Sequence, residues 1–226
     1  MITAVDREEL RVAIYRGFAE TGRAPTCQAL ADILNVVPEE IISGMRDLAA
    51  ARHLVLDPGD EVVMAHPFSS IPLGFAVMGR RTLWWGGCAW DAFALPHLLH
   101  DEPDVLVATR CPGCDRPLAW VVGRHSAPEG REVAHFLTPV SKIWDDVVHA
   151  CANQRLFCDR DCVLTWLTRT GHSEGYVMDL GTLWRLGSDW YTGRLSRGYT
   201  RREPADARTY FRDVGLQGDF WGLSGT

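Results

Sequence analysis

Hydrophobic positions in the first fifty residues repeat at the spacing of a helix. The first series recurs every four residues, at Leu10, Ile14 and Phe18. It predicts an amphipathic helix over residues 6–20, which a glycine and a proline then interrupt. Thr26 is a suitable N-cap for a short second helix. Pro38, followed by two glutamates, suits the first turn of a third helix.

An alternating pattern follows the three helices. Residues 53–64 read as two short strands around the turn Asp57-Pro-Gly-Asp60, which predicts a β-hairpin. Three helices and a hairpin resemble a winged helix, a unit that often binds DNA. Residues 1–70 contain eleven Asp and Glu against six Arg, so this unit would repel DNA. We therefore interpret it as a structural module.

The polar segment 65–70 is the predicted connector between an N-terminal domain, residues 1–70, and a second domain, residues 71–226. The second domain mixes strand and helix patterns. Strands are predicted at 73–78, 104–108 and 118–122, and helices from near Cys88 to before Pro96 and over 159–170. The C-terminal third has no clear pattern. The fold class predicted is α+β, a winged-helix-like unit followed by a mixed sheet with flanking helices.

Composition narrows the classes of function. The 226 residues carry a formal net charge of −6 and a single lysine, which argues against a nucleic-acid partner. No apolar stretch approaches the ~20 residues that span a bilayer, and the N-terminus has no leader pattern, so we expect a cytoplasmic protein without a membrane partner. Glycine-rich phosphate loops are absent, so no organic cofactor is expected. In a reducing compartment the seven cysteines are candidate metal ligands or nucleophiles.

A cysteine and an aspartate stand three residues apart in Trp84-Trp-Gly-Gly-Cys-Ala-Trp-Asp91. If a helix begins near Cys88, its thiol and the Asp91 carboxylate share one face. A thiol in the first turn of a helix ionises more readily, and a neighbouring carboxylate can accept or return a proton. Alone, such a pair is more often a buried structural cysteine beside a surface aspartate. The adjacent tryptophans either wall an apolar pocket or fill the core.

Four other segments add to this one: Ala65-His-Pro-Phe-Ser, Trp144-Asp-Asp-Val-Val-His-Ala-Cys151-Ala-Asn, Trp190-Tyr-x-Gly-Arg194 and Gly218-Asp-Phe-Trp-Gly222. With the Cys88 segment, they resemble the alkylmercury (organomercurial) lyase family over nearly the whole chain. The resemblance implies an enzyme that cleaves carbon–mercury bonds by protonolysis with two cysteines and an aspartate, here Cys88, Asp91 and Cys151. A small organometallic compound would be the substrate, and Hg²⁺ would remain as bound product.

The second cysteine of that set needs a choice, because Cys158 also follows an apolar residue only seven positions after Cys151. Cys151 is preferred because its spacing from Asp145 and Asp146, and to Trp166, matches the pattern of the family. Thiolates are the protein ligands that soft metals such as mercury prefer. In this interpretation Asp91 carries the proton that releases the hydrocarbon.

Cys158 has another explanation in a second set of cysteines. Cys111-Pro-Gly-Cys114 is a C-x-x-C pair between two predicted strands, and Cys158 and Cys162 form a C-x-x-x-C pair at the start of a predicted helix. This arrangement resembles the treble-clef-like metal sites of TRASH-type modules and predicts a structural Zn²⁺ bound by four cysteines. The alternatives are four free buried thiols or a redox C-x-x-C pair. Members of the lyase family need not carry this site.

Two alternatives to the lyase remain open. One is a non-catalytic soft-metal-binding or metal-sensing protein on the same fold, in which the four-cysteine site matters most. A weaker one uses the thiols for other chemistry on a small molecule. A thiol or metal acceptor is the other expected partner, and the sequence does not define the oligomeric state.

The remaining polar residues receive structural interpretations. His97 and His100 are assigned to packing or the surface, whereas His149, on a predicted strand, either tunes the pKa of Cys151 or simply packs. A mild basic run is interpreted as a solvated loop: Arg194, Arg197, Arg201 and Arg202.

Overall fold

The N-terminal region folds as the three helices that the sequence predicts. The computed structural model describes residues 5–223. Its first helices are α1 (Arg7–Thr21), α2 (Cys27–Leu34) and α3 (Pro38–Ala50). The Asp6 side chain accepts hydrogen bonds from two backbone N–H groups at the start of α1, and Thr26 accepts one at the start of α2. These caps satisfy N–H groups that the first turn of a helix leaves without partners.

Seven strands form one antiparallel sheet in the spatial order β1-β2-β3-β5-β4-β6-β7. They are β1 (Val55–Leu56), β2 (Val62–Ala65), β3 (Phe68–Ser69), β4 (Phe75–Met78), β5 (Leu83–Gly86), β6 (Asp104–Arg110) and β7 (Pro117–Gly123). The predicted hairpin, β1 and β2, is thus part of the main sheet. The connector predicted at 65–70 was wrong, because positions 65–69 are buried and include β3, whose backbone pairs with β2 and β5. The division into domains at residue 70 stays a prediction.

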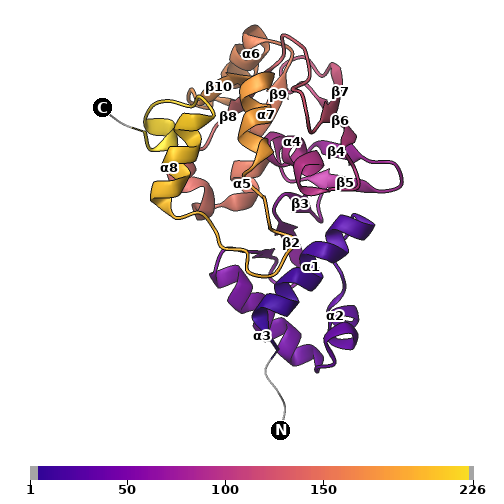
Figure 1. The fold of residues 1–226 in the computed structure, drawn as a ribbon. Coiled ribbons are helices and arrows are strands. Elements are labelled where there is room, and N and C mark those ends of the chain that lie inside the picture. Colours follow the sequence, from indigo (N-terminus) through magenta and orange to yellow (C-terminus); the bar gives the residue numbers. More distant parts are fainter. Residues whose placement is uncertain (1–4, 224–226) are drawn as a thin grey trace.

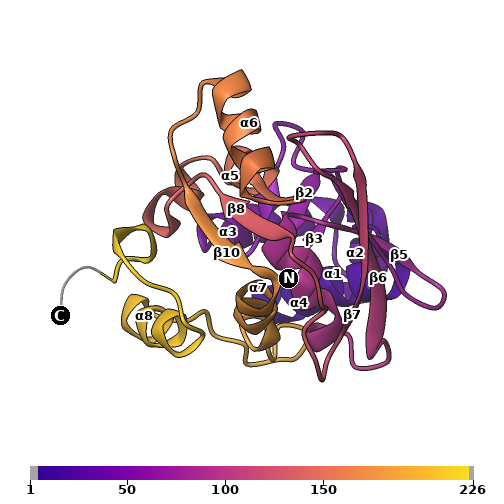
Figure 2. The ribbon, with the colours of Figure 1, turned by 90° about the horizontal axis from the view of Figure 1, so that it is seen from above.

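Helix α4 (Ala89–Leu98) is enclosed on nearly all sides. Strands β6 and β7 alternate exposed and buried residues, so the sheet presents one apolar face. Helix α4 packs on that face, and α7 (Leu180–Ser188) covers its other side (Figure 2). The predicted end of this helix before Pro96 was wrong, because the helix continues to Leu98. A proline removes one helix hydrogen bond, and burial of α4 between the sheet and α7 outweighs that loss.

The chain from residue 133 onward forms a second, three-stranded antiparallel sheet in the order β10-β8-β9. Its strands are β8 (Val133–Phe136), β9 (Gln154–Phe157) and β10 (Tyr176–Asp179). The helices around it are α5 (Val147–Ala152), α6 (Arg160–Thr170) and α8 (Pro204–Asp213), with short 3₁₀ helices η1 (Val140–Asp145) and η2 (Asp219–Trp221). The strand predicted at His149 was wrong: Asp146 caps His149 N–H, and the segment is helix α5.

The segment between α7 and α8, residues 189–203, runs back across the molecule to α1 (Figure 1). We call it the strap. Arg11 of α1 donates hydrogen bonds to two strap carbonyls, those of Arg194 and Ser196. Arg197 of the strap forms an ion pair with Glu9. The two hydrogen bonds from the buried Arg11 hold the strap against α1, beside the cavity described below.

The fold is therefore a mixed α+β structure with antiparallel sheets, as predicted from the sequence. One continuous cluster of buried apolar residues extends from α1 to η2. Within residues 5–223, no helix combines the length and the apolar character needed to cross a bilayer.

Candidate active site

A small cavity lies where α4, α5, the strap and the β2–β3 connection meet. Its volume is about 100 Å³. The reactive and polar residues lining it include His66, Cys88, Asp91, Cys151, Gln154, Tyr191, Arg194, Arg201 and Arg202. Three tryptophans complete much of the wall: Trp90, Trp144 and Trp190. The structure thus brings the three predicted catalytic residues to one cavity, although Cys151 is 60 or more positions along the chain from the other two.

Cys88 and Asp91 are held together by the start of α4. Cys88 is the N-cap, and its Sγ accepts a long hydrogen bond, 3.5 Å, from the backbone N–H of Asp91. The Cys88 thiol lies 3.3 Å from Asp91 Oδ2 and donates to it. Both side chains are buried, with 2% and 1% exposure respectively. A buried carboxylate and a buried thiol in contact form a pair that can exchange a proton without solvent.

Three side chains donate hydrogen bonds to the Asp91 carboxylate. His66 Nδ1 lies 3.0 Å from Oδ2, the Tyr191 hydroxyl bonds Oδ1, and the third donor is Cys88. Burial alone would raise the pKa of Asp91, but the charge of His66 and these hydrogen bonds outweigh it, so the pKa is lowered. Asp91 is therefore an ionised, buried base.

The two cysteines of the cavity hold their protons tightly. Burial, a hydrogen bond to Cys151 and the Asp91 charge raise the pKa of Cys88 well above its usual value. A hydrogen bond with Cys88 lowers the pKa of Cys151, but burial and the Asp91 charge outweigh it, and the net shift is upward. The resting cavity therefore contains two thiols and one carboxylate. A metal that binds both sulfurs must displace their protons.

The same cavity also contains potential metal ligands other than sulfur. His66, Asp91 and Cys151 each offer one ligand atom, and these atoms lie within 4.8 Å of one another. His66 was missed in the sequence, where its segment was interpreted as a connector. Its position directly before Pro67-Phe-Ser, in a segment that resembles the family, was the available signal.

The strap supplies two further residues that sequence reasoning missed. Tyr191 and Arg194 are 6% and 7% exposed and line the cavity. The interpretation of Arg194 as part of a solvated loop was wrong, because the strap packs against α1 and encloses its guanidinium. Both residues belong to the segment Trp190-Tyr-x-Gly-Arg194.

Of the tryptophans near Cys88, only Trp90 lines the cavity. Trp84 instead packs beneath α1, where its indole N–H donates to the Phe18 carbonyl at 2.9 Å. His97 stacks edge-on against Trp184, consistent with packing. His149 is exposed on α5 and is not among the groups that shift the pKa of Cys151.

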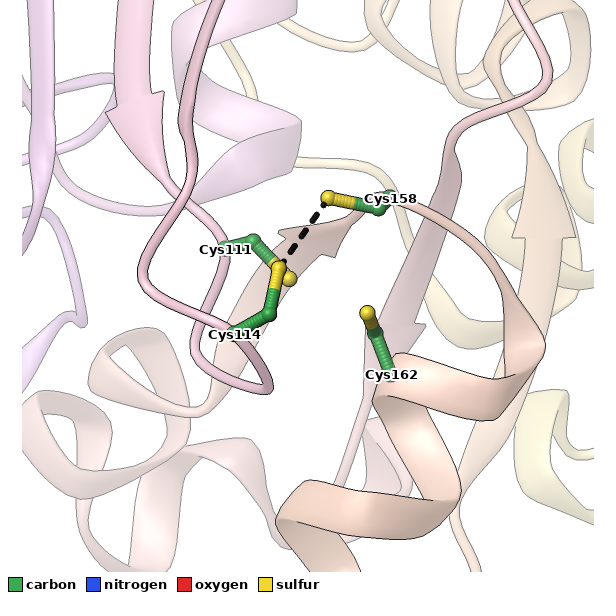
Figure 3. Close-up of side chains that lie close together, drawn as sticks. All are labelled: Cys111, Cys114, Cys158 and Cys162. Carbon is green, nitrogen blue, oxygen red and sulfur yellow. Dashed lines mark hydrogen bonds between the residues drawn. The ribbon is translucent and has the colours of Figure 1, made fainter.

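The four cysteines of the second set form a separate cluster (Figure 3). Strand β9 begins at Gln154, which lines the cavity, and ends directly before Cys158 of this cluster. Cys111 and Cys114 lie at the turn between β6 and β7, Cys158 follows β9, and Cys162 lies in the first turn of α6. All four Sγ atoms lie within 4.8 Å of one another, and those of Cys114 and Cys158 are 3.4 Å apart. The cluster could bind a metal, and it joins the two sheets of the fold.

A glycine allows the two parts of this cluster to approach. A Cβ atom at Gly113 would lie 2.3 Å from the Cys162 carbonyl oxygen, so no larger residue fits without a shift of backbone.

The exposed Cys114 thiol of this cluster ionises readily: a hydrogen bond from the Arg116 backbone, then bonds with Cys158 and Cys111, lower its pKa to about 7. Thiolates are the form in which cysteines bind metals.

The fold and the cavity define a protein with two buried thiols and a buried, ionised carboxylate at one site. The family model for MerB, alkylmercury lyase, matches residues 68–192. The chain therefore belongs to the alkylmercury lyase family. The matched region contains Cys88, Asp91, Cys151 and all four cysteines of the second cluster. No curated protein matches the chain.

A solved structure supports the same fold. The chain is similar to the structure described as the mercury-bound form of MerB2, with a TM-score of 0.60 and 19% sequence identity. The match covers 82% of this chain and 91% of the other. It therefore extends well beyond the region of the family model.

Proposed function

We propose that this protein cleaves the carbon–mercury bond of organomercurials by protonolysis and yields a hydrocarbon and Hg²⁺. One observation carries the proposal: the buried side chains of Cys88, Asp91 and Cys151 line the same cavity. Membership of the alkylmercury lyase family supports this reaction class.

The proposed reaction balances without an oxidant or a reductant. A substrate R–Hg–X and the two thiols give R–H, HX and Hg²⁺ bound by two thiolates. Mercury is a soft metal that thiolates bind well, so its binding drives loss of the protons that Cys88 and Cys151 hold at rest. One proton leaves with X. The other moves from Cys88 to Asp91 across their 3.3 Å contact and then to the carbon as the carbon–mercury bond breaks.

The direct test is the release of benzene from phenylmercury by the purified protein in excess thiol. We expect one benzene per phenylmercury consumed and many turnovers per protein molecule, because the excess thiol removes Hg²⁺ from the two sulfurs. Absence of benzene would contradict the proposal. If mercury were still retained in that case, the non-catalytic metal-binding alternative, which the four-cysteine cluster favours, would replace it.

Gly87 provides a test of the Asp91 position. A Cβ atom there would lie 2.4 Å from Asp91 Oδ2 and 2.6 Å from Met64 Cε. We expect Gly87→Ala to push the carboxylate away from Cys88 and to lower the rate constant of bond cleavage roughly 10- to 100-fold, the usual effect of misplacing a reacting group by about 1 Å. Single-turnover benzene release measures it.

The matched control for Gly87→Ala is Gly181→Ala in α7, where a Cβ atom meets only ordinary contacts at 3.4 and 3.6 Å. Both variants add one methyl group. Equal activity of the two variants would show that Asp91 does not need the position that the structure gives it.

We also propose that the four-cysteine cluster binds a structural Zn²⁺. Four Zn–S bonds of about 2.3 Å at tetrahedral angles place sulfurs about 3.8 Å apart. The observed limit of 4.8 Å and the 3.4 Å contact of Cys114 with Cys158 fit that size. A bound metal would fix the β6–β7 turn to the start of α6.

A reducing compartment suits both sites, and we propose the cytoplasm. All seven cysteines are free thiols in the structure. Oxidation of either set would remove the sulfurs that the two proposed metal sites need. A soluble thiol is the proposed acceptor of the mercury that the reaction leaves on Cys88 and Cys151.

A further inference from the structure

The cavity contains a buried guanidinium that the proposed reaction does not use. Arg194 is 7% exposed and donates hydrogen bonds to the His66 carbonyl at 2.7 Å and the Tyr199 hydroxyl at 2.6 Å. Its Nε is buried without a hydrogen-bond partner in the described part of the chain. No carboxylate in residues 5–223 lies within 4.0 Å of its nitrogens. Arg194 is thus a buried cation without a paired anion.

A second arginine in the cavity wall is also unpaired. Arg201 is half-buried, stacks over the Trp144 ring at 4.9 Å and donates only to the carbonyls of Ala51 and Arg52. Among the described residues no carboxylate pairs with it either, whereas its neighbour Arg202 bonds the Asp189 carboxylate at 2.7 Å. Two of the three arginines that line the cavity therefore lack a counter-charge.

These two cations raise the electrostatic potential of their surroundings. Burial, and then the charge of Arg194, lower the pKa of Arg201. Burial and the charges of Arg194, Arg11 and Arg201 lower the pKa of His53 to about 4. The Asp91 carboxylate does not offset them by contact, since it is bonded to His66, Tyr191 and Cys88. Arg194 is buried and Arg201 half-buried in the wall of one cavity; cations in such a setting without an anion are costly, and an anionic ligand relieves that cost.

The cavity adjoins a larger hollow at Arg201, although Arg194 does not line that hollow and Asp189, Asp206 and Asp213 do. This second hollow of about 620 Å³ shares Trp190, Tyr199, Arg201 and Arg202 with the first. The first cavity, at about 100 Å³, holds little beyond a metal and a small organic group. A substituent on the bound compound can therefore reach past the two sulfurs and meet Arg201.

From this geometry we infer that Arg194 and Arg201 form a subsite for a carboxylate carried by the organomercurial compound. The inference rests on the proposed lyase function and specifies its substrate class. The carboxylate can belong to the organic group that leaves as hydrocarbon or to the thiolate that accompanies mercury into the site. Guanidinium groups pair with carboxylates through two parallel hydrogen bonds, which positions the compound with its mercury between Cys88 and Cys151.

The test compares 4-carboxyphenylmercury with phenylmercury, each supplied with neutral mercaptoethanol or with anionic 3-mercaptopropionate. For wild type we expect a higher kcat/KM wherever a carboxylate is present. If the carboxylate on the phenyl ring raises kcat/KM, the subsite binds the organic group. If 3-mercaptopropionate raises it instead, the subsite binds the thiolate that accompanies mercury. In Arg201→Gln we expect this preference to fall about tenfold, the effect of removing one charged hydrogen-bond donor.

Arg197→Gln is the matched control, because Arg197 is an exposed strap arginine that pairs with Glu9 and does not line the cavity. It should retain the preference. A wild type without any preference, or an Arg201→Gln variant that keeps it, would overturn the subsite. Failure of the lyase proposal looks different, since neither compound would then release benzene or benzoate.

A binding measurement keeps the inference testable even then. In the Asp91→Ala background both compounds stay intact, and their dissociation constants can be compared by competition with mercaptoethanol. We expect the carboxylated compound to bind more tightly and Arg201→Gln to remove about tenfold of that difference. The ratio of the two dissociation constants is compared between Asp91→Ala and the double variant Asp91→Ala/Arg201→Gln. An equal ratio in these two proteins would refute the subsite independently of turnover.

Discussion

Asp91→Asn should lower benzene release from phenylmercury by about 10²- to 10⁴-fold, the usual contribution of a positioned proton carrier. Asparagine has the shape of aspartate. Its amide oxygen can accept the Tyr191 hydrogen bond and its NH₂ group can donate to Nδ1 of a neutral His66, so the cavity should keep its form. Asparagine cannot take the proton from Cys88 or deliver it to carbon. Because the pKa of Asp91 is lowered and that of Cys88 is raised, the wild-type resting state already has the base and the proton in place at neutral pH.

The Asp91→Asn experiment needs two measurements on the same samples: benzene by gas chromatography and mercury retained after desalting. Retention should continue, because the sulfurs of Cys88 and Cys151 remain. Asp101→Asn, an exposed aspartate just beyond the other end of α4, is the control and should behave as wild type. Turnover within a few fold of wild type in Asp91→Asn would exclude Asp91 as the proton carrier.

Local patterns made much of the fold predictable from sequence. Helices α1, α2 and α3 followed from apolar spacing, and Thr26 occupies the predicted cap. These signals involve residues within one or two turns of each other, where backbone preferences decide the structure. The failures lie where distant packing decides it. Pro96 lies inside α4 because two layers enclose the helix, and β3 lies in a segment whose polar sequence suggested a connector.

The candidate sites show the same division. The four cysteines could be grouped because each pair has a local spacing, and the structure brings their sulfurs together. The partners of Asp91 could not be derived in this way. Tyr191 is 100 residues from Asp91 along the chain, and Arg194 is 128 from His66, so only the path of the strap brings them into contact. Tyr191 and Arg194 belong to the segment Trp190-Tyr-x-Gly-Arg194, which resembles the family, but the residue types of that segment do not indicate that these two side chains are buried.

Cys111→Ser should abolish metal binding by the four-cysteine cluster and destabilise the whole protein. We expect about one zinc per chain in wild type by elemental analysis and none in the variant, since a cage of three thiolates binds far less tightly. The cluster connects the β6–β7 turn of one sheet to β9 and α6 of the other. Loss of several kcal/mol of metal-linked folding energy should lower the unfolding temperature by roughly 10 °C in a chain of this size.

Cys27→Ser is the matched control, because Cys27 lies on α2 outside both clusters, packs at the edge of the core and donates a hydrogen bond to the Pro38 carbonyl, at 3.5 Å. Strand β9 makes a further consequence testable. It begins at Gln154, which lines the cavity three residues after Cys151, and it ends beside Cys158. Release of the cluster should therefore loosen the second sulfur of the cavity and slow cleavage, whereas added zinc should restore both properties in chelator-treated wild type only. A metal-free wild type with unchanged unfolding temperature would show that the four thiols, although adjacent, hold no structural ion.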